Sequence, residues 1–485
     1  MSGSGERACR PPPLAWRMDG SWSPPTADIP RSAAGTEPGK GPFDMRILKP
    51  RNTSGKTAPA AENAAPQPPA APRAAQRIRC AGEQLLADEV TAEIVLAAWS
   101  GDPAIVVRSP PGSGKTRLTV HLADILADRA GLRVGIAAQT RAQAVEIARR
   151  LAAVSDRRLV GVLWKSNGPR PDVGDCPIIG NKYQIWPASG GAVRVATSAK
   201  WLVSEPERLA ADVLIVDEAY QATYADLCAL GSMTSKQVVL VGDSGQIAPV
   251  VTGDVSRWAD SPTGPHLPCP QALAAAHRDV VTTVALKYTW RLGPVTTALV
   301  QSAFYPDLPF TSRRPDEHVS QAGTALPELA HRVIDAPDGP TSQSVTDAVA
   351  RRVRELLDTG AVHTEAGARP LVEADLAVVV PHVAQAAAIR ATLAEFPNVL
   401  CGTANALQGL ERAAVVAVHP MVGKRTPEGF ALDASRLCVM LSRHRSHLTV
   451  LVDAQTEAVL GNHTTDDAVI AAAVVLDQIM RTKHL

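Results

Sequence analysis

The chain has 485 residues, a formal net charge of +1 at pH 7, 45% hydrophobic residues and 20% charged residues. This is the ordinary composition of a soluble globular protein with room for two or three domains. A charge this close to zero excludes a protein that coats nucleic acid through charge alone, although a local basic groove stays compatible with it. None of the seven cysteines has the two-residue spacing of zinc sites, so we expect reduced thiols in a cytoplasmic protein.

Residues 1–78 are expected to form a disordered tail. They hold 14 of the 39 prolines and few large apolar residues, so they cannot bury enough surface to offset the entropy of ordering. Their excess of 11 lysines and arginines over 6 acids would allow weak contact with nucleic acid, but a solvated leader would have the same composition. The start lacks the apolar core of a secretory signal, and the longest apolar run, 468–476, is half a membrane span, so we expect no membrane association.

From Cys80 onward, short apolar runs alternate with helical stretches, which predicts an α/β fold with parallel sheets covered by helices. The runs are apolar throughout, as in parallel strands that are buried on both faces. They form two series of five, which predicts two lobes, 79–280 and 281–485. The expected strands are 104–107, 134–137, 193–196, 213–216 and 237–241 in the first lobe, and 282–286, 376–380, 399–402, 414–418 and 447–452 in the second.

The strand at 104–107 leads into SPPGSGKT and a helix from Arg117, which is the context of a phosphate-binding loop. Its amides and the helix N-terminus would cradle phosphates, Lys115 would reach the β- and γ-phosphates of ATP, and the Thr116 hydroxyl would bind Mg²⁺. Ser109 stands where the pattern expects glycine, so the loop alone could be an accidental match. The residues expected to bind the nucleotide are Pro111, Gly112, Ser113, Gly114, Lys115, Thr116 and Arg117.

Acidic side chains end the strand in VLIVDEA. Asp217 would hold Mg²⁺ and Glu218 would deprotonate the attacking water, whereas the alternative is a pair of solvated acids at a strand end. The phosphate-binding loop upstream favours the catalytic interpretation. The next strand runs into Asp243-Ser244-Gly245-Gln246, where Gln246 could sense the γ-phosphate.

Taken in order, these segments resemble a superfamily 1 helicase, in the branch that contains the nonsense-mediated-decay RNA helicase and its DNA-acting relatives. The second half adds LKYTWRLGP, with Trp290 in place of the family's tyrosine, VVVPHVAQ, GTANALQGLE and RLCVMLSRHR. The resemblance covers roughly residues 80–460. It implies two RecA-type lobes with ATP and Mg²⁺ between them.

Several residue roles come from this resemblance. It makes Arg443 the arginine that reaches across the cleft, beside Arg445, and it makes Arg291 a second arginine of the site. A guanidinium supplied across the cleft would stabilise charge on the γ-phosphate, although either arginine alone could be a surface ion pair. Gln84 would contact adenine, and Glu411, in the segment that couples ATP to nucleic acid, is also expected to contact the nucleotide.

The expected partner is single-stranded nucleic acid, with DNA slightly favoured over RNA. The family places the strand across both lobes, so Thr140, Thr197 and Gln408 are candidate contacts that would grip phosphates and not read sequence. Residues 147–200 carry nine basic residues against three acids, interleaved with Trp164, Tyr183, Trp186 and Trp201. This mix suits stacking platforms in a strand-tracking groove, or equally the core of a small insertion at 147–190.

Two hypotheses of different classes remain. The first is an ATP-dependent helicase or single-strand translocase, and the second is an ATP-gated clamp on nucleic acid or a partner, without unwinding activity. A wedge that splits a duplex would distinguish them, and no segment identifies one. A small-molecule kinase would leave the second lobe and Arg443 unexplained.

Overall fold

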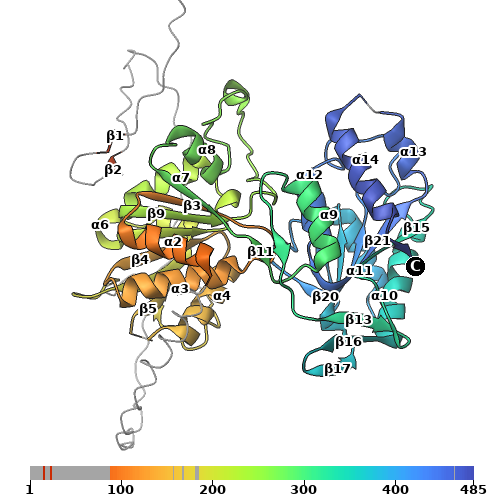
Figure 1. The fold of residues 1–485 in the computed structure, drawn as a ribbon, viewed down its shortest axis with the longest axis horizontal. Helices are drawn as coiled ribbons and strands as arrows, with labels where there is room; N and C mark the ends of the chain where they lie inside the picture. Colours follow the sequence, from red (N-terminus) through yellow and green to blue (C-terminus); the bar gives the residue numbers. More distant parts are fainter. Residues whose placement is uncertain are drawn as a thin grey trace, which may run out of the picture.

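The computed structural model describes residues 88–156, 158–165, 169–180, 185–463 and 465–485, and two short strands nearer the N-terminus. These two, β1 (Ala15–Trp16) and β2 (Trp22–Ser23), pair antiparallel. The rest of the predicted tail, and Gln84 with it, lies outside the described residues. From residue 88 the chain forms two lobes side by side, with β11 (Tyr288–Thr289) between them (Figure 1).

The first lobe is built on an eight-stranded sheet in which every neighbouring pair is parallel. All five strands expected there are present, and their residues are largely buried, as the continuous apolar runs predicted. In spatial order the strands are β10 (Val281–Ala285), β3 (Ala104–Arg108), β9 (Thr234–Gly242), β8 (Ala211–Asp217), β4 (Arg133–Ala138), β7 (Ala192–Thr197), β5 (Val160–Leu163) and β6 (Ile178–Ile179).

The position of β10 corrects one expectation. The sequence pattern places the run at 282–286 in the second lobe, but β10 pairs with β3, with Val281 opposite Ala104. β10 is thus the edge strand of the first sheet, and it pairs with β3, the strand that leads into the phosphate-binding loop. The chain therefore leaves the first sheet only after residue 286, and we call residues 88–286 the first lobe and 287–485 the second.

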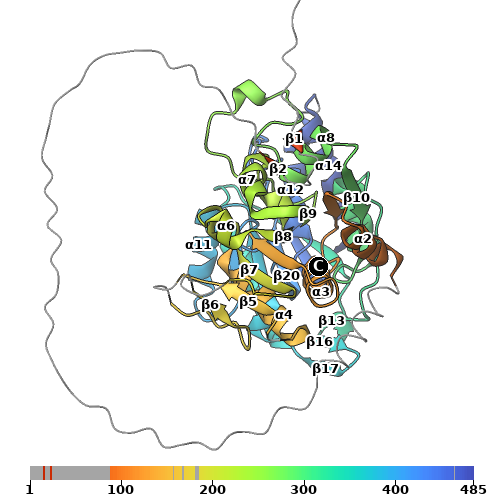
Figure 2. The same cartoon turned by 90° about the vertical axis from the view of Figure 1, so that its left-hand side faces the viewer.

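Helices cover both faces of the first sheet, each burying one apolar stripe. On one face α2 (Glu89–Ser100), α3 (Lys115–Asp128) and α4 (Arg141–Val154) pack on the sheet through Ile94, Leu122 and Ile147. The opposite face carries α5 (Ser198–Leu202), α6 (Pro206–Leu209), α7 (Tyr224–Leu230) and α8 (Cys269–Ala276). Figure 2 shows the strands between these two layers. The result is a doubly covered parallel sheet.

The second lobe has a six-stranded sheet, again parallel throughout. Four of its strands were expected, whereas β15 and the short β22 were missed. Along the sheet the order is β19 (Leu400–Thr403), β18 (Leu376–Val380), β20 (Arg412–Val418), β21 (His444–Asp453), β15 (Leu329–Ile334) and β22 (Lys483–His484).

Two layers of helices enclose the second sheet. One face packs against α9 (Pro294–Phe304), α12 (Ala434–Leu441), α13 (Thr456–Gly461) and α14 (Asp467–Met480). The other packs against α10 (Gln343–Thr359) and α11 (Val383–Thr392). A small antiparallel sheet lies at the end of this lobe and consists of β14 (Thr324–Ala325), β13 (His318–Gln321), β16 (Gly360–Thr364) and β17 (Gly367–Pro370). Within the described residues, no helix is long and apolar enough to cross a membrane.

Candidate nucleotide site between the lobes

The phosphate-binding loop has the expected form. Gly112 and Gly114 have φ values of +71° and +86°, which L side chains rarely adopt. Gly114 precedes α3 and provides no side-chain cap, so the first amides of the helix have no side-chain acceptor. The Ser113 hydroxyl is also buried without a hydrogen-bond partner. Unpaired donors at a helix N-terminus are what an anionic phosphate group would satisfy.

Ser109, the departure from the usual glycine, has a structural role. Its hydroxyl donates to the Gly242 carbonyl at 2.7 Å, and its amide donates to the same oxygen at 3.0 Å. The side chain is fully buried. These bonds join the start of the loop to the end of β9, so the serine strengthens the loop's attachment to the sheet.

Lys115 lies among three carboxylates from neighbouring strand ends. Its Nζ is 3.7 Å from Glu218 Oε1 and 3.6 Å from Asp243 Oδ2. Both separations exceed the ~2.8 Å of a charge-assisted hydrogen bond, so Lys115 is not tightly bound to either partner. Asp217 is 3% exposed and accepts a hydrogen bond from the Thr119 hydroxyl at 3.4 Å. Burial and the adjacent Glu218 raise the pKa of Asp217 to about 7, against the opposing charge of Lys115.

These oxygens fit a magnesium ion that accompanies a nucleotide. Thr116 follows Lys115 in the first turn of α3, and Asp217 ends β8 beside it, which gives a hydroxyl and a carboxylate of the hard oxygen type that Mg²⁺ prefers. A second positive charge near Asp217 and Glu218 would offset their mutual repulsion. No cluster of three or more histidine, cysteine, aspartate or glutamate residues that could hold a metal ion occurs in the described part of the chain.

Gln246 connects the first lobe to the second. Its Nε2 donates to Asp243 Oδ2 at 2.6 Å, and its Oε1 accepts from Gln408 Nε2 at 2.8 Å. Asp243, which is fully buried, also accepts from the Tyr305 hydroxyl of the second lobe. Asp243 and Tyr305 were not predicted as site residues. Asp243 could have been found from the sequence because it directly follows β9, next to β8, which ends in Asp217.

The two arginines predicted for the site, Arg291 and Arg443, both belong to the second lobe. Arg291 forms an ion pair with Glu411 and donates to the Ser442 carbonyl at 3.3 Å. Burial alone would raise the pKa of Glu411, but Arg291 and Arg445 outweigh it, and the pKa is lowered. Glu411 is therefore bound to arginine in this structure.

Arg443 is 1% exposed and is held by Val439 O at 3.0 Å and Ser442 Oγ at 3.0 Å. Burial, followed by the charge of Arg291, lowers the pKa of Arg443 to about 10, while Asp243 and Glu218 oppose this shift. At neutral pH the guanidinium remains charged. It is thus a buried cation within electrostatic reach of the carboxylates of the first lobe.

The tandem arrangement agrees with comparisons to known sequences. The chain matches an AAA domain over residues 88–267 and a second AAA domain over residues 273–455. Over 274 residues it is 25% identical to DNA-binding protein SMUBP-2 of Rattus norvegicus, a match that covers 52% of this chain and 25% of that protein. The Mus musculus protein of the same name gives the same identity and coverage. The chain belongs to the superfamily 1 helicases.

The chain spans about a quarter of the length of both relatives. Among solved structures, it is similar to the arterivirus nonstructural protein 10 helicase, with a TM-score of 0.39 and 16% identity over 76% of this chain and 61% of the other. The complex of that helicase with DNA gives a TM-score of 0.38 and 17% identity over 72% of this chain and 61% of the other.

Two of the candidate nucleic-acid contacts, Thr140 and Thr197, lie just after or at the carboxyl end of a strand, and both also cap helices. Thr140 accepts a hydrogen bond from the Gln143 amide at the start of α4, and Thr197 accepts one from the Lys200 amide at the start of α5. Thr140 is exposed and Thr197 is half-buried, whereas Gln408 points to Gln246.

Of the aromatic residues proposed as stacking platforms, Trp186 and Trp201 belong to the core, whereas Trp164 is half-buried. Trp201 is fully buried and donates to the Ile136 carbonyl, and Trp186 is 7% exposed and donates to the Leu209 carbonyl. They cannot serve as stacking platforms, because hydrophobic burial determines their position. Tyr183 lies outside the described residues. The predicted insertion is represented by β5 and β6, which extend the edge of the first sheet.

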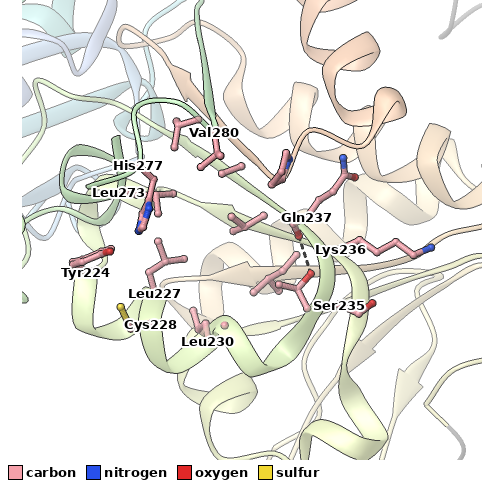
Figure 3. Close-up of a pocket in the computed structure, with 17 residues that line it drawn as sticks. Tyr224, Leu227, Cys228, Leu230, Ser235, Lys236, Gln237, Leu273, His277 and Val280 are labelled. Carbon is pink, nitrogen blue, oxygen red and sulfur yellow. Dashed lines mark hydrogen bonds between the residues drawn. The ribbon is translucent and has the colours of Figure 1, made fainter. Parts of the chain in front are cut away.

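A separate apolar cavity lies in the first lobe between α7, α8 and the strands β9 and β10 (Figure 3). Tyr224, Leu227, Leu273 and His277 are among its lining residues. No residue predicted for the nucleotide site lines this cavity, so it is not the cleft between the lobes.

Proposed function

We propose that this chain is an ATP-dependent motor that hydrolyses ATP in the cleft between its two lobes and moves along single-stranded nucleic acid. The observation that carries the proposal is the contact series Lys115, Asp243, Gln246 and Gln408, which runs from the phosphate-binding loop to the second lobe. Through this series, a change of charge at Lys115 on nucleotide binding would affect Gln408 in the opposite lobe.

In this proposal the P-loop amides and Lys115 bind the phosphates of ATP, and Thr116 and Asp217 hold the Mg²⁺ that neutralises them. Glu218 accepts the proton of the attacking water as that water adds to the γ-phosphorus. Its backbone is in the left-handed region, with φ of 51°, a conformation that is uncommon for glutamate and that marks many functional positions. Charge that develops on the γ-phosphate oxygens would be stabilised by Arg291 and Arg443 when the lobes close.

Closure requires the arginines to give up present partners. Arg291 is paired with Glu411, and Arg443 is bound to carbonyl and hydroxyl oxygens of its own lobe. A γ-phosphate would compete for both guanidiniums as a bidentate acceptor. Release of Glu411 on ATP binding would then alter the Gln408–Glu411 segment, which is one route by which the nucleotide could influence grip on the strand.

The nucleic-acid partner is the second part of the proposal. The name of the SMUBP-2 relatives describes them as DNA-binding, which favours DNA over RNA as the strand bound here. The carboxyl ends of β4 and β7, which carry Thr140 and Thr197, form adjacent parts of one sheet edge. Backbone amides and hydroxyls at such an edge suit contacts to phosphates that do not depend on sequence.

The test is steady-state ATP hydrolysis by the full chain at moderate salt, alone and with single-stranded DNA, single-stranded RNA or duplex DNA. Strong stimulation by a single strand supports the motor and identifies its track. ATP hydrolysis that no nucleic acid stimulates would contradict the proposal and favour an ATPase gated by a protein partner. A strand-displacement assay with the stimulating strand then separates unwinding from translocation or clamping.

A further inference from the structure

Tyr305 belongs to the second lobe but reaches into the first. It directly follows α9, and its hydroxyl donates to Asp243 Oδ1 at 2.5 Å. Tyr305 is 1% exposed and Asp243 is fully buried, so this bond is made out of contact with water. A hydrogen bond to a carboxylate in such surroundings is strong and costly to lose.

The loop that carries Asp243 fits closely around this tyrosine. A Cβ atom on Gly245 would overlap Tyr305 Cζ, so the loop can pass the ring only because residue 245 has no side chain. Two residues later, Ile247 is 6% exposed and packs within the apolar core of the second lobe, with Leu292 and Val300. Residues 243–247 follow a strand of the first lobe but are anchored in the second.

Asp243 faces the nucleotide site with its other oxygen. Oδ2 accepts from Gln246 at 2.6 Å and lies 3.6 Å from Lys115 Nζ, while Oδ1 holds Tyr305 and the Gly245 amide at 3.1 Å. The carboxylate thus joins a side chain of the second lobe to the phosphate-binding lysine. Burial and the nearby Asp243 raise the pKa of Tyr305 well above 10, so the phenol stays a donor throughout the working pH range.

We propose that Tyr305 is a positioning residue for ATP hydrolysis: its hydroxyl fixes Asp243, so that movement of the second lobe is transmitted to Lys115. The inference rests on the proposed ATPase function and adds to it a residue outside the set proposed to bind nucleotide or nucleic acid. Without the hydroxyl, Asp243 Oδ1 would retain only the Gly245 amide, and the carboxylate would turn toward Lys115 to regain a partner.

The experiment compares the full chain with Tyr305→Phe, which keeps the ring and its edge-to-face contact with Phe310 at 5.5 Å. The matched control is Tyr224→Phe, which removes a phenol hydroxyl from the cavity of Figure 3, away from the cleft. Two quantities are measured: kcat and KM for ATP with the stimulating strand, and hydrogen exchange of the backbone amides of residues 243–248.

For Tyr305→Phe we expect kcat to fall about tenfold, the scale of one charge-assisted hydrogen bond, with KM for ATP changed less than about twofold. We expect amide exchange in residues 243–248 to accelerate by about fivefold or more, because the loop loses an anchor. Tyr224→Phe should match the parent in both measurements.

Unchanged kcat and unchanged exchange in Tyr305→Phe would overturn the inference while the proposed ATPase stands. A parallel loss of kcat, ATP affinity and thermal stability would also overturn it, since that is the behaviour of a structural residue. If the parent itself hydrolyses no ATP, the proposed function fails, and the exchange measurement alone then decides whether Tyr305 positions the loop.

Discussion

The side-chain amide of Gln408 in the second lobe donates a hydrogen bond from Nε2 to Oε1 of Gln246 in the first, at 2.8 Å. The amide of Gln246 cannot turn freely, because its own Nε2 is used by Asp243 at 2.6 Å. Gln246 therefore presents an acceptor to the second lobe, and only a donor at position 408 satisfies it. The contact between the lobes therefore requires a donor on residue 408 and an acceptor on Gln246.

Replacement of Gln408 by glutamate tests this contact. In Gln408→Glu two acceptor oxygens would face each other in a partly buried position, so we expect stimulation of ATP turnover by single-stranded nucleic acid to fall about tenfold. Gln408→Leu, which removes the donor without adding charge, should have a smaller effect. Equal stimulation in the parent and in Gln408→Glu would show that the contact does not transmit the signal.

Glu218 and Lys115 can be separated by their effects on binding and on chemistry. Glu218→Gln keeps the shape of the side chain but loses the proposed base, so we expect turnover to fall by about a hundredfold or more with ATP binding retained. Lys115→Ala removes the cation that faces Glu218 at 3.7 Å and Asp243 at 3.6 Å, so both ATP binding and turnover should be lost. Binding is measured by titration with a fluorescent ATP analogue, and normal turnover by Glu218→Gln would contradict its role as base.

The parts of this site that the sequence predicted are those set by neighbouring residues. The phosphate-binding loop, Asp217 and Glu218 directly follow apolar runs, and glycines or acids at the end of such a run are typical of a ligand site at a strand end. The strands β3, β4 and β8 were predicted for the same reason, since burial on both faces requires continuous apolar residues.

What the sequence did not reveal depends on contacts between distant residues. Tyr305 is 62 residues from Asp243, and nothing local indicates that its hydroxyl crosses between lobes. The placement of β10 beside β3 likewise depends on pairing across 177 residues, from Ala104 to Val281. Trp186 and Trp201 are equally compatible with a core and with a nucleic-acid surface until the sheet under them is known.

The variant Arg443→Ala tests whether Arg443 acts in ATP hydrolysis and not in the binding of the product ADP. The residue is buried, with bonds to Val439 O and Ser442 Oγ, and belongs to the lobe opposite the phosphate-binding loop. We expect Arg443→Ala to lower kcat by about a thousandfold, as for other arginines that stabilise phosphoryl transfer, with ADP affinity changed little. Because the side chain is buried, Arg443→Lys is the control for folding: it keeps the positive charge and should retain more activity. Normal turnover in Arg443→Ala would remove the argument for catalysis across the cleft.

Acid should weaken the second lobe through buried neutral histidines, and His447 is the clearest case. Its Nδ1 donates to the Pro327 carbonyl at 2.6 Å, and its Nε2 faces Arg352 Nη2 at 3.0 Å. Arginine can only donate, so Nε2 must be the unprotonated acceptor. Burial, reinforced by the charge of Arg352, lowers the pKa of His447 to about 3.

The sign of the effect follows from this lowered pKa. In the unfolded chain a histidine takes up its proton near pH 6.5, whereas in the folded lobe His447 resists protonation down to about 3. Its contribution to stability is therefore complete above pH 6.5 and is lost as the pH falls below that value. At pH 5 the loss from one such residue amounts to roughly 2 kcal/mol.

The measurement is the free energy of unfolding in urea at pH 7.5 and pH 5 for the parent and for His447→Gln. The variant should be less stable at pH 7.5, because it disturbs the contact with Arg352, but its loss of stability between the two pH values should be smaller than that of the parent by roughly 2 kcal/mol. His463→Gln, at an exposed position, serves as the matched control. If His447→Gln loses as much stability on acidification as the parent, His447 is not held neutral in the folded lobe, and the acid sensitivity must arise from other buried histidines such as His419 and His444.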